Sequence, residues 1–241
     1  MIARAVEREA LSVHDADDPI VVEFPLRGEW AVPNTPGTRV PSHGTDALGS
    51  RFAYDFLQVD WRRAGRPCYR ASFLRYLLLG VPIDSCYCYG ETVYAPCDGT
   101  VVGVEADWPE RRHARLLSDA RRAARNSGFD PEVGDVRELA GNHVILRCRE
   151  GVYAAFCHLR PSTVKVELGQ VVAQGEPLGA VGHSGNSYYP HLHFQLMDDP
   201  DLTRAAGLPC AFASYEAFEH GAWKKMHEGV PTADDRIRFL A

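Results

Sequence analysis

The sequence predicts a mainly β fold, an antiparallel β-sandwich or open barrel with a helical insertion and a partly helical C-terminal tail. Three observations predict it: short β-branched and aromatic runs recur along the chain, glycine turns separate them, and one central stretch changes to helical spacing. Many short strands with glycine turns are typical of sandwiches and barrels. We expect an N-terminal extension over 1–20, a β domain over 21–200 and a C-terminal extension over 201–241.

The composition is that of a soluble globular protein. The 241 residues are 45% hydrophobic and 24% charged, with a formal net charge of −6. No long run of lysine and arginine appears, so we expect no nucleic-acid partner, and the arginine-rich stretch 111–125 is expected to be a solvated helix face. The most apolar run, 73–81, is too short to cross a bilayer, so no membrane span is expected. Nothing in the sequence sets an oligomeric state.

The seven cysteines match no zinc-knuckle spacing. We expect buried or half-buried free thiols in a reducing compartment, with a redox or metal pair at Cys86 and Cys88 as the alternative. The first 19 residues carry scattered charges and no apolar core segment, so they do not resemble a secretory signal. Both features favour a cytoplasmic location.

Extended segments are expected first at 20–24 and 52–59, around a loop rich in Gly, Pro, Ser and Thr. Residues 92–106 read as a strand, a tight turn and a second strand. The pattern then changes to helical spacing from Trp108 to about Asn126, with Asp107 as a candidate cap. This predicts a helical insertion over about 107–140.

Strands resume after the insertion. Residues 142–148 and 152–159 flank Gly151 and predict a hairpin. Short apolar strands punctuated by glycines follow, and they end in a strand over 191–197. The mixed tail 202–241 is expected to pack a helix or two on the outside.

The last of these strands contains His191-Leu192-His193. Because side chains alternate along a strand, both histidines fall on one face, about 7 Å apart, and the apolar residues fall on the other. An isolated His-x-His is most often a pair of surface histidines. Here His158 ends another strand and Asp55 interrupts an apolar one, where a carboxylate needs a partner. Imidazole and carboxylate ligands with an open position are what a catalytic zinc requires.

Motifs across both halves of the β region combine into a specific resemblance over roughly residues 90–200. The sequence resembles the lysostaphin/LytM-type zinc endopeptidases, which have the duplicated hybrid motif fold and cut peptide cross-bridges of bacterial peptidoglycan. The motifs are Ala95-Pro96-x-Asp98-Gly99-x-Val101, Gly141-Asn142-x-Val144-x-Leu146, Cys157-His158-Leu159, Gly169-Gln170-x-Val172-x-x-Gly175-x-x-Leu178-Gly179 and Gly182-x-Ser184-Gly185-Asn186-Ser187-x-x-Pro190-His191-Leu192-His193-Phe194.

The resemblance implies that His193 binds Zn²⁺, that His191 acts as base or orienter of the attacking water, and that His158 stabilises the developing oxyanion. It also implies a metal-binding His and Asp with three residues between them. Asp55 fits the Asp, but Arg51 occupies the position of the His, and a guanidinium has no lone pair for zinc. The nearest upstream histidine is His43, which we take as the third ligand.

A competing pairing joins His43 to Asp46, with two residues between them. We prefer Asp55, because its segment has the stronger strand pattern and an apolar residue follows it, as the resemblance implies. His183, in a glycine-rich turn, is a candidate to line the site, and His143 is a candidate to face the groove.

Three functions remain open at this point. The first is a zinc metallopeptidase acting on a peptide or peptidoglycan-like substrate. The second is a catalytically weak or inactive module that binds a peptide or glycan or activates a partner enzyme, which Arg51 favours. The third is a carrier or phosphotransfer domain with His158 or His191 as acceptor, which the second histidine of His-x-His and Asp55 disfavour.

Overall fold

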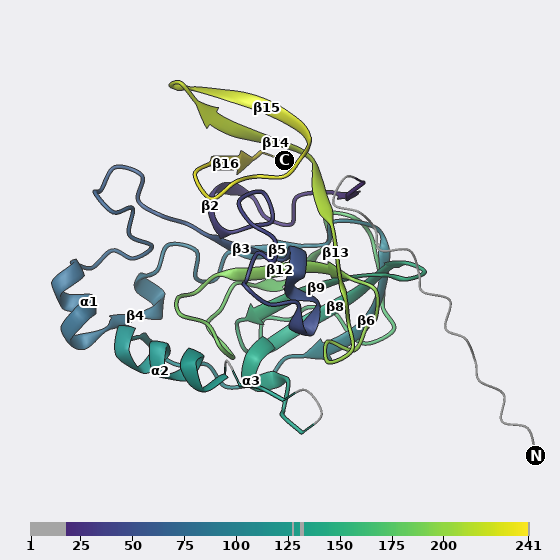
Figure 1. The fold of residues 1–241 in the computed structure, drawn as a ribbon, viewed down its shortest axis with the longest axis horizontal. Helices are drawn as coiled ribbons and strands as arrows, with labels where there is room; N and C mark the ends of the chain where they lie inside the picture. Colours follow the sequence, from purple (N-terminus) through teal and green to yellow (C-terminus); the bar gives the residue numbers. More distant parts are fainter. Residues whose placement is uncertain (1–17, 127, 131–132, 241) are drawn as a thin grey trace, which may run out of the picture.

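The computed structural model describes residues 18–126, 128–130 and 133–240. These residues form a large mixed sheet of twelve strands that does not close into a barrel (Figure 1). The mainly β fold is confirmed. The order in the sheet is β1 (Ile20–Val22), β14 (Cys210–Glu219), β16 (Arg236–Phe239), β2 (Gly28–Asn34), β3 (Tyr54–Leu57), β12 (Leu192–Met197), β9 (Val152–Leu159), β8 (Asn142–Arg149), β6 (Gly99–Glu105) and β10 (Val171–Val172), with β13 (Gly207–Leu208) beside β12 and β15 (Ala222–Gly229) beside β14.

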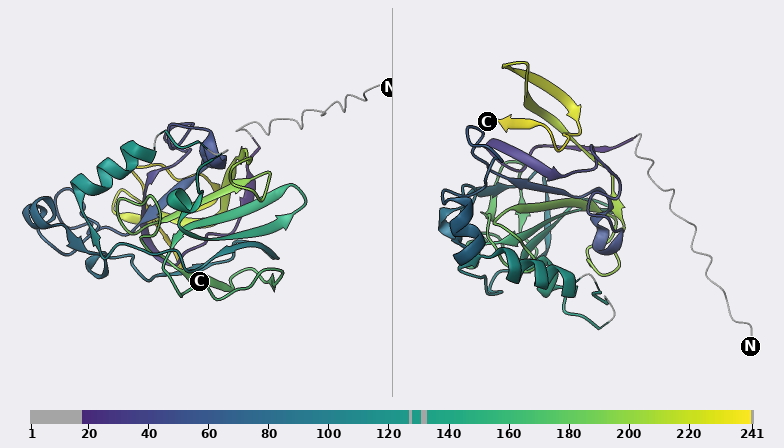
Figure 2. Two further views of the ribbon diagram at one scale, coloured as in Figure 1. Left: turned by 90° about the horizontal axis from the view of Figure 1, so that it is seen from below. Right: turned by 60° about the vertical axis from the view of Figure 1, so that its left-hand side comes forward.

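Two small sheets and several short helices surround this sheet. β5 (Thr92–Tyr94) pairs with β11 (Pro177–Ala180), and β4 (Val81–Pro82) pairs with β7 (His113–Ala114). Figure 2 shows α1 and α2 on one side of the molecule, outside the large sheet. The helical segments are η1 (Ala47–Phe52), α1 (Phe73–Leu79), η2 (Ile83–Ser85), α2 (Leu116–Asn126) and α3 (Arg137–Ala140). No helix of the described residues is long and apolar enough to span a membrane.

The main core lies on one face of the large sheet. Leu192, Phe194 and Leu196 of β12 are fully buried there, as the alternating pattern predicts. An aromatic cluster built on Phe24 and Phe212 joins the strands, with ring centroids 5.0 Å apart. The other face of β12 carries His193 and Gln195, beside a smaller apolar cluster that includes Ala155, Cys157 and Met197.

The insertion is helical over a shorter range than the sequence predicts. α2 begins at Leu116 instead of Trp108, because Trp108 is bound to the large sheet and His113–Ala114 pair with β4. The buried side chain of Asn142 holds the Trp108 backbone: its Oδ1 accepts from the Trp108 amide at 2.7 Å and its Nδ2 donates to the Trp108 carbonyl at 2.8 Å. These bonds take the place of a helix start near Asp107.

The prediction of a helical C-terminal tail was wrong. Residues after 206 form β13 to β16, and β14 and β16 join the large sheet. The overlooked signal is His220-Gly221, where both residues have positive φ, 52° and 86°. A two-residue hairpin turn of this kind requires that conformation. The domain boundary at residue 200 stays a prediction, and most of the N-terminal extension lies outside the described residues.

The expectation of seven free thiols was wrong for two of them. Cys97 and Cys148 form a disulfide, with their Cα atoms 6.1 Å apart. A separation of 51 residues in the chain gives no sign of the pairing, which depends on how the strands fold together. The other five cysteines, Cys86 and Cys88 among them, are free and buried. The cytoplasmic location stays a prediction.

The thiols yield a direct test of this arrangement. Burial raises the pKa of Cys68, Cys88 and Cys157 to about 12 and also raises that of Cys86 and Cys210, so the folded protein should be almost inert to a thiol reagent at pH 8. Denaturation should expose five thiols, and reduction of the denatured chain should raise the number to seven. Seven thiols without reduction would contradict the disulfide.

Candidate metal centre

Strand register places Asp55 and His193 side by side. β3 and β12 are antiparallel neighbours, and Asp55 pairs directly with His193 across them. Tyr54 and Phe56 point into the core, so Asp55 points to the opposite face, which His193 shares. The Asp55 Oδ1 and His193 Nδ1 atoms are 3.0 Å apart.

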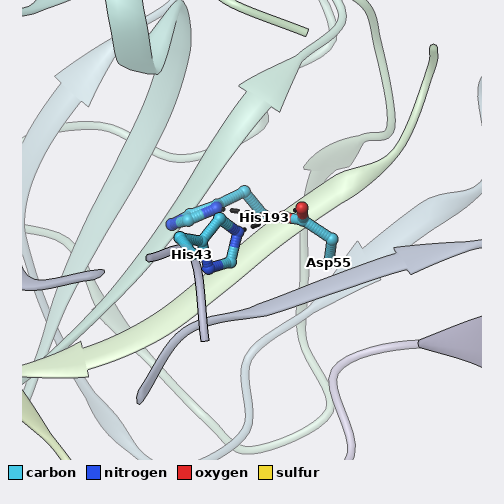
Figure 3. A group of neighbouring side chains, drawn as sticks. All are labelled: His43, Asp55 and His193. Atoms are coloured by element: carbon cyan, nitrogen blue, oxygen red, sulfur yellow. Dashed lines mark hydrogen bonds and ion pairs between the residues drawn. The ribbon is translucent and has the colours of Figure 1, made fainter. Parts of the chain in front are cut away.

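His43 reaches the same point from a loop. The Ser42 amide donates to the Arg51 carbonyl at 2.9 Å, which closes the loop, and the His43 Nε2 atom lies 3.0 Å from Asp55 Oδ2 (Figure 3). Arg51 points away and pairs with Asp46 at 2.8 Å, with both side chains exposed. Asp55, and not Asp46, therefore lies with His43 and His193.

His191 and His158 lie beside these three residues. The His191 Nε2 atom is 3.4 Å from Asp55 Oδ1, and the rings of His191 and His158 are 4.7 Å apart at their centroids. Strict alternation after Cys157, which pairs with His193, would aim His158 at the core. Its backbone is in the left-handed region instead, with φ 62°, and this break in the alternation lets the ring join the other histidines.

Backbone carbonyls define the tautomer of His158 and His191. A carbonyl oxygen can only accept, so the ring nitrogen facing it carries the hydrogen and the other nitrogen presents a lone pair. The acceptors are the Ser184 carbonyl for His158 Nδ1, at 3.0 Å, and the Tyr189 carbonyl for His191 Nδ1, at 2.7 Å, so Nε2 presents the lone pair of both neutral rings. His43 Nδ1 lies 3.0 Å from the Ser42 hydroxyl, which itself donates to the Ser50 carbonyl and so accepts from the ring. His193 lies between two acceptors, with Nε2 2.8 Å from the Gln195 amide oxygen and Nδ1 3.0 Å from Asp55 Oδ1.

The pKa values of the cluster residues are shifted in different directions. Burial would raise the pKa of Asp55, but the imidazoles of His191 and His43 outweigh it and hold that pKa well below its usual range. Burial lowers the pKa of His191, yet the Asp55 carboxylate raises it more, so the net shift is upward. Burial and the neighbouring rings of His191 and His193 hold the pKa of His158 well below its usual range. The cluster therefore contains a charged carboxylate and a neutral His158.

The donor set fits a zinc ion. His43, Asp55 and His193 each offer one ligand atom, and these atoms lie within 4.8 Å of one another. The buried His43 Nε2 atom makes no hydrogen bond although Asp55 Oδ2 is 3.0 Å away, so the two atoms do not point at each other. Zinc bonds of about 2.0 to 2.2 Å would place tetrahedral ligands roughly 3.4 Å apart, close to the observed separations.

The insertion supports the His191 loop from behind. Arg111 donates to His183 Nε2 at 3.2 Å and to the Ser187 carbonyl at 2.5 Å. His183 Nδ1 then donates to the Ser187 hydroxyl at 3.0 Å, which in turn donates to the Tyr189 carbonyl that holds His191. Burial and the Arg111 charge lower the pKa of His183 to about 2, so it stays neutral.

Sequence reasoning missed this support. Arg111 was expected on a solvated helix face, but it lies before α2 and is largely enclosed, with 22% of its side chain exposed. Nothing in its neighbourhood distinguishes it from the exposed Arg112 and Arg115. His183 lies behind the cluster and not in it. His143 is buried with its Nδ1 bound to the Gly141 carbonyl at 2.8 Å, also outside the cluster.

One segment of the chain matches a known protein family. Residues 123–204 match the model of Peptidase family M23. The matched segment contains His158, His191 and His193 but neither His43 nor Asp55. The cell division protein DipM of Caulobacter vibrioides is 40% identical over 62 residues, which is 26% of this chain and 10% of that protein.

The solved structures that resemble this chain do so with low sequence identity and low TM-scores. A zinc-containing peptidase from Vibrio cholerae is 16% identical with a TM-score of 0.38, covering 78% of this chain and 39% of that one. The catalytic domain of lysostaphin from Staphylococcus simulans is 18% identical with a TM-score of 0.37, covering 75% of this chain and 88% of that one. The family match is confined to residues 123–204, and over this segment the resemblance to the lysostaphin/LytM-type family is confirmed.

Proposed function

We propose that this chain is a zinc-dependent metallopeptidase that hydrolyses a peptide bond in peptidoglycan-type cross-bridges. Peptidases of the M23 type are typically zinc enzymes acting on peptidoglycan. The observation that carries the proposal is the meeting of His43, Asp55 and His193, from three separate parts of the chain, with two further histidines beside them. His43, Asp55 and His193 would hold the metal.

Zinc bound there would polarise a substrate carbonyl and lower the pKa of water. The protein moves the protons. His191 Nδ1 is bound to the Tyr189 carbonyl, so Nε2 has the lone pair that accepts a proton from the attacking water. The same nitrogen can return that proton to the leaving amine.

His158 has a more specific role than the sequence suggests. Its Nδ1 hydrogen is bound to the Ser184 carbonyl, so at rest its Nε2 has no hydrogen to offer an oxyanion. Its depressed pKa also keeps it neutral. We therefore assign it oxyanion stabilisation only when its Nε2, instead of His191, takes up the proton that the attacking water releases, and the fixed ring then directs that N–H at the oxyanion.

A non-catalytic role, in which the chain binds a peptide or glycan or activates a partner enzyme, is favoured by Arg51 at the expected position of a ligand. In that case the site would be incomplete and the metal weakly held. The two functions differ in what the loop residue His43 contributes to metal binding.

We expect His193→Ala to weaken zinc binding at least about 100-fold, because it removes a ligand fixed by the sheet. Competition with a chromophoric chelator measures the affinity, and metal analysis checks for one zinc per chain. His227→Ala, a change at an exposed histidine far along β15, is the matched control. Unchanged affinity in His193→Ala would contradict the site.

His43 and Arg51 are distinguished by a paired measurement. We expect His43→Ala to weaken zinc binding about 100-fold or more, whereas Arg51→His should change it by no more than about threefold, because the Arg51 side chain points away from the cluster. A large gain in affinity for Arg51→His, with His43→Ala neutral, would instead mean that the natural site is incomplete and would support the non-catalytic role.

Proton transfer is tested separately from metal binding. His191→Asn and His158→Asn should keep zinc within about tenfold of the parent affinity but lose about 10²- to 10⁴-fold in kcat on a cross-bridge peptide. Asparagine is chosen because it tolerates the left-handed backbone of residue 158. Full activity in both variants would remove these residues from the mechanism.

A further inference from the structure

Helix α1 presents apolar side chains to solvent. Five of its seven residues are large, exposed hydrophobic residues, and they form what we call the α1 patch. Figures 1 and 2 show α1 at one edge of the molecule, away from the large sheet. Single exposed apolar residues are ordinary, but such a concentration marks an interaction site. The patch consists of Phe73 (65% exposed), Leu74 (63%), Leu77 (42%), Leu78 (70%) and Leu79 (61%).

The exposure does not come from a loosely attached helix. Tyr76 is 2% exposed and packs against Tyr69 and Tyr189, with ring centroids 5.1 and 5.4 Å away. The Ser72 hydroxyl accepts from the Arg75 amide at 3.3 Å and caps the first turn. Arg63 donates to three backbone carbonyls of the preceding loop, at 3.0–3.4 Å. The patch is thus held facing outward.

The segment that carries the patch is rich in arginine and lies between Asp60 and Asp84. Residues 61–83 contain five arginines and no acidic residue, in a chain with a net charge of −6. Arg62, Arg66, Arg70 and Arg75 are exposed. At the other end of the helix, Arg115 packs against Gly80, where an added Cβ would lie 2.5 Å from its Cγ atom. An apolar centre with an arginine rim is complementary to an anionic surface above an apolar layer.

We propose that the α1 patch and these arginines dock the protein on the surface of an anionic phospholipid bilayer. The leucines and Phe73 would enter the boundary between headgroups and acyl chains, and the arginine side chains would extend toward lipid phosphates. A two-turn helix lies on such a surface and does not cross it. A bilayer of neutral lipid would still accommodate the leucines, but it would offer the arginines no net negative charge.

Docking would also fix the position of the metal centre. Tyr189 packs against Tyr76 of α1, and its carbonyl accepts from His191 Nδ1 at 2.7 Å. Two residues therefore separate the docking surface from the His191 ring. The catalytic cluster would act on substrate that lies next to the bilayer.

Vesicle co-sedimentation of the whole chain tests the proposal. We expect binding to vesicles of phosphatidylcholine with phosphatidylglycerol to be at least about tenfold stronger than binding to phosphatidylcholine alone, and to weaken with added salt. Failure to bind, or equal binding to both lipids, would overturn the proposal. Neither result bears on zinc affinity, so the outcome is independent of the proposed function.

Two pairs of variants assign the binding to α1. Leu74→Gln with Leu78→Gln keeps good helix formers and should weaken vesicle binding about tenfold or more. Leu168→Gln with Val171→Gln, at residues 71% and 76% exposed elsewhere, should leave it unchanged. Likewise Arg62→Gln with Arg75→Gln should weaken binding about tenfold, and Arg147→Gln with Arg149→Gln should do so less than threefold.

Self-association is the competing occupant of the patch. Light scattering during size-exclusion chromatography measures the mass of the parent chain and of the Leu74→Gln, Leu78→Gln variant without lipid. We expect the same mass for both. A dimer that dissociates in the variant, together with vesicle binding that the variant does not weaken, would assign the patch to a second copy of the chain and overturn the lipid proposal.

Discussion

The pairing of Asp55 with His193 across two neighbouring strands is the constraint on which the candidate centre depends. A slip of one residue would turn one of the two side chains into the core and the other away from it. The apolar neighbours on β3 and β12 prevent that slip, because they fill the core on the opposite face. Packing on one face of the sheet therefore holds the metal-binding geometry on the other.

The other histidines are held around this pair by hydrogen bonds to residues outside the cluster. His158 and His191 each give one N–H to a backbone carbonyl, and Ser42 and Gln195 hold His43 and His193, so the rings are oriented without a metal to hold them. Such outer contacts tune both affinity and basicity of metal ligands. Arg111, which belongs to the insertion, donates to His183 and Ser187 and so supports the loop before His191. The insertion is therefore part of the scaffold of the site.

The parts that the sequence predicts are those with a local signal. Alternation in β12 places Leu192, Phe194 and Leu196 in the core, and the glycine-linked strands indicate the mainly β fold. The parts that it does not predict depend on distant contacts. Cys97 meets Cys148, and Arg111 reaches His183, only because strands far apart in the chain become neighbours. The tail is a different case: His220-Gly221 is a local hairpin signal that was overlooked.

The loop origin of His43 sets this site apart from one built on strands alone, because Arg51 points outward from the position where the resemblance implies a histidine. The central claim is that His43, Asp55 and His193 converge on one ion. Anomalous diffraction at the zinc edge, from crystals of the zinc-loaded protein, tests it most directly. The account predicts a single peak within bonding distance of His43 Nε2, an Asp55 carboxylate oxygen and His193 Nδ1. A peak bound by other side chains, or one that lacks His43, would contradict it.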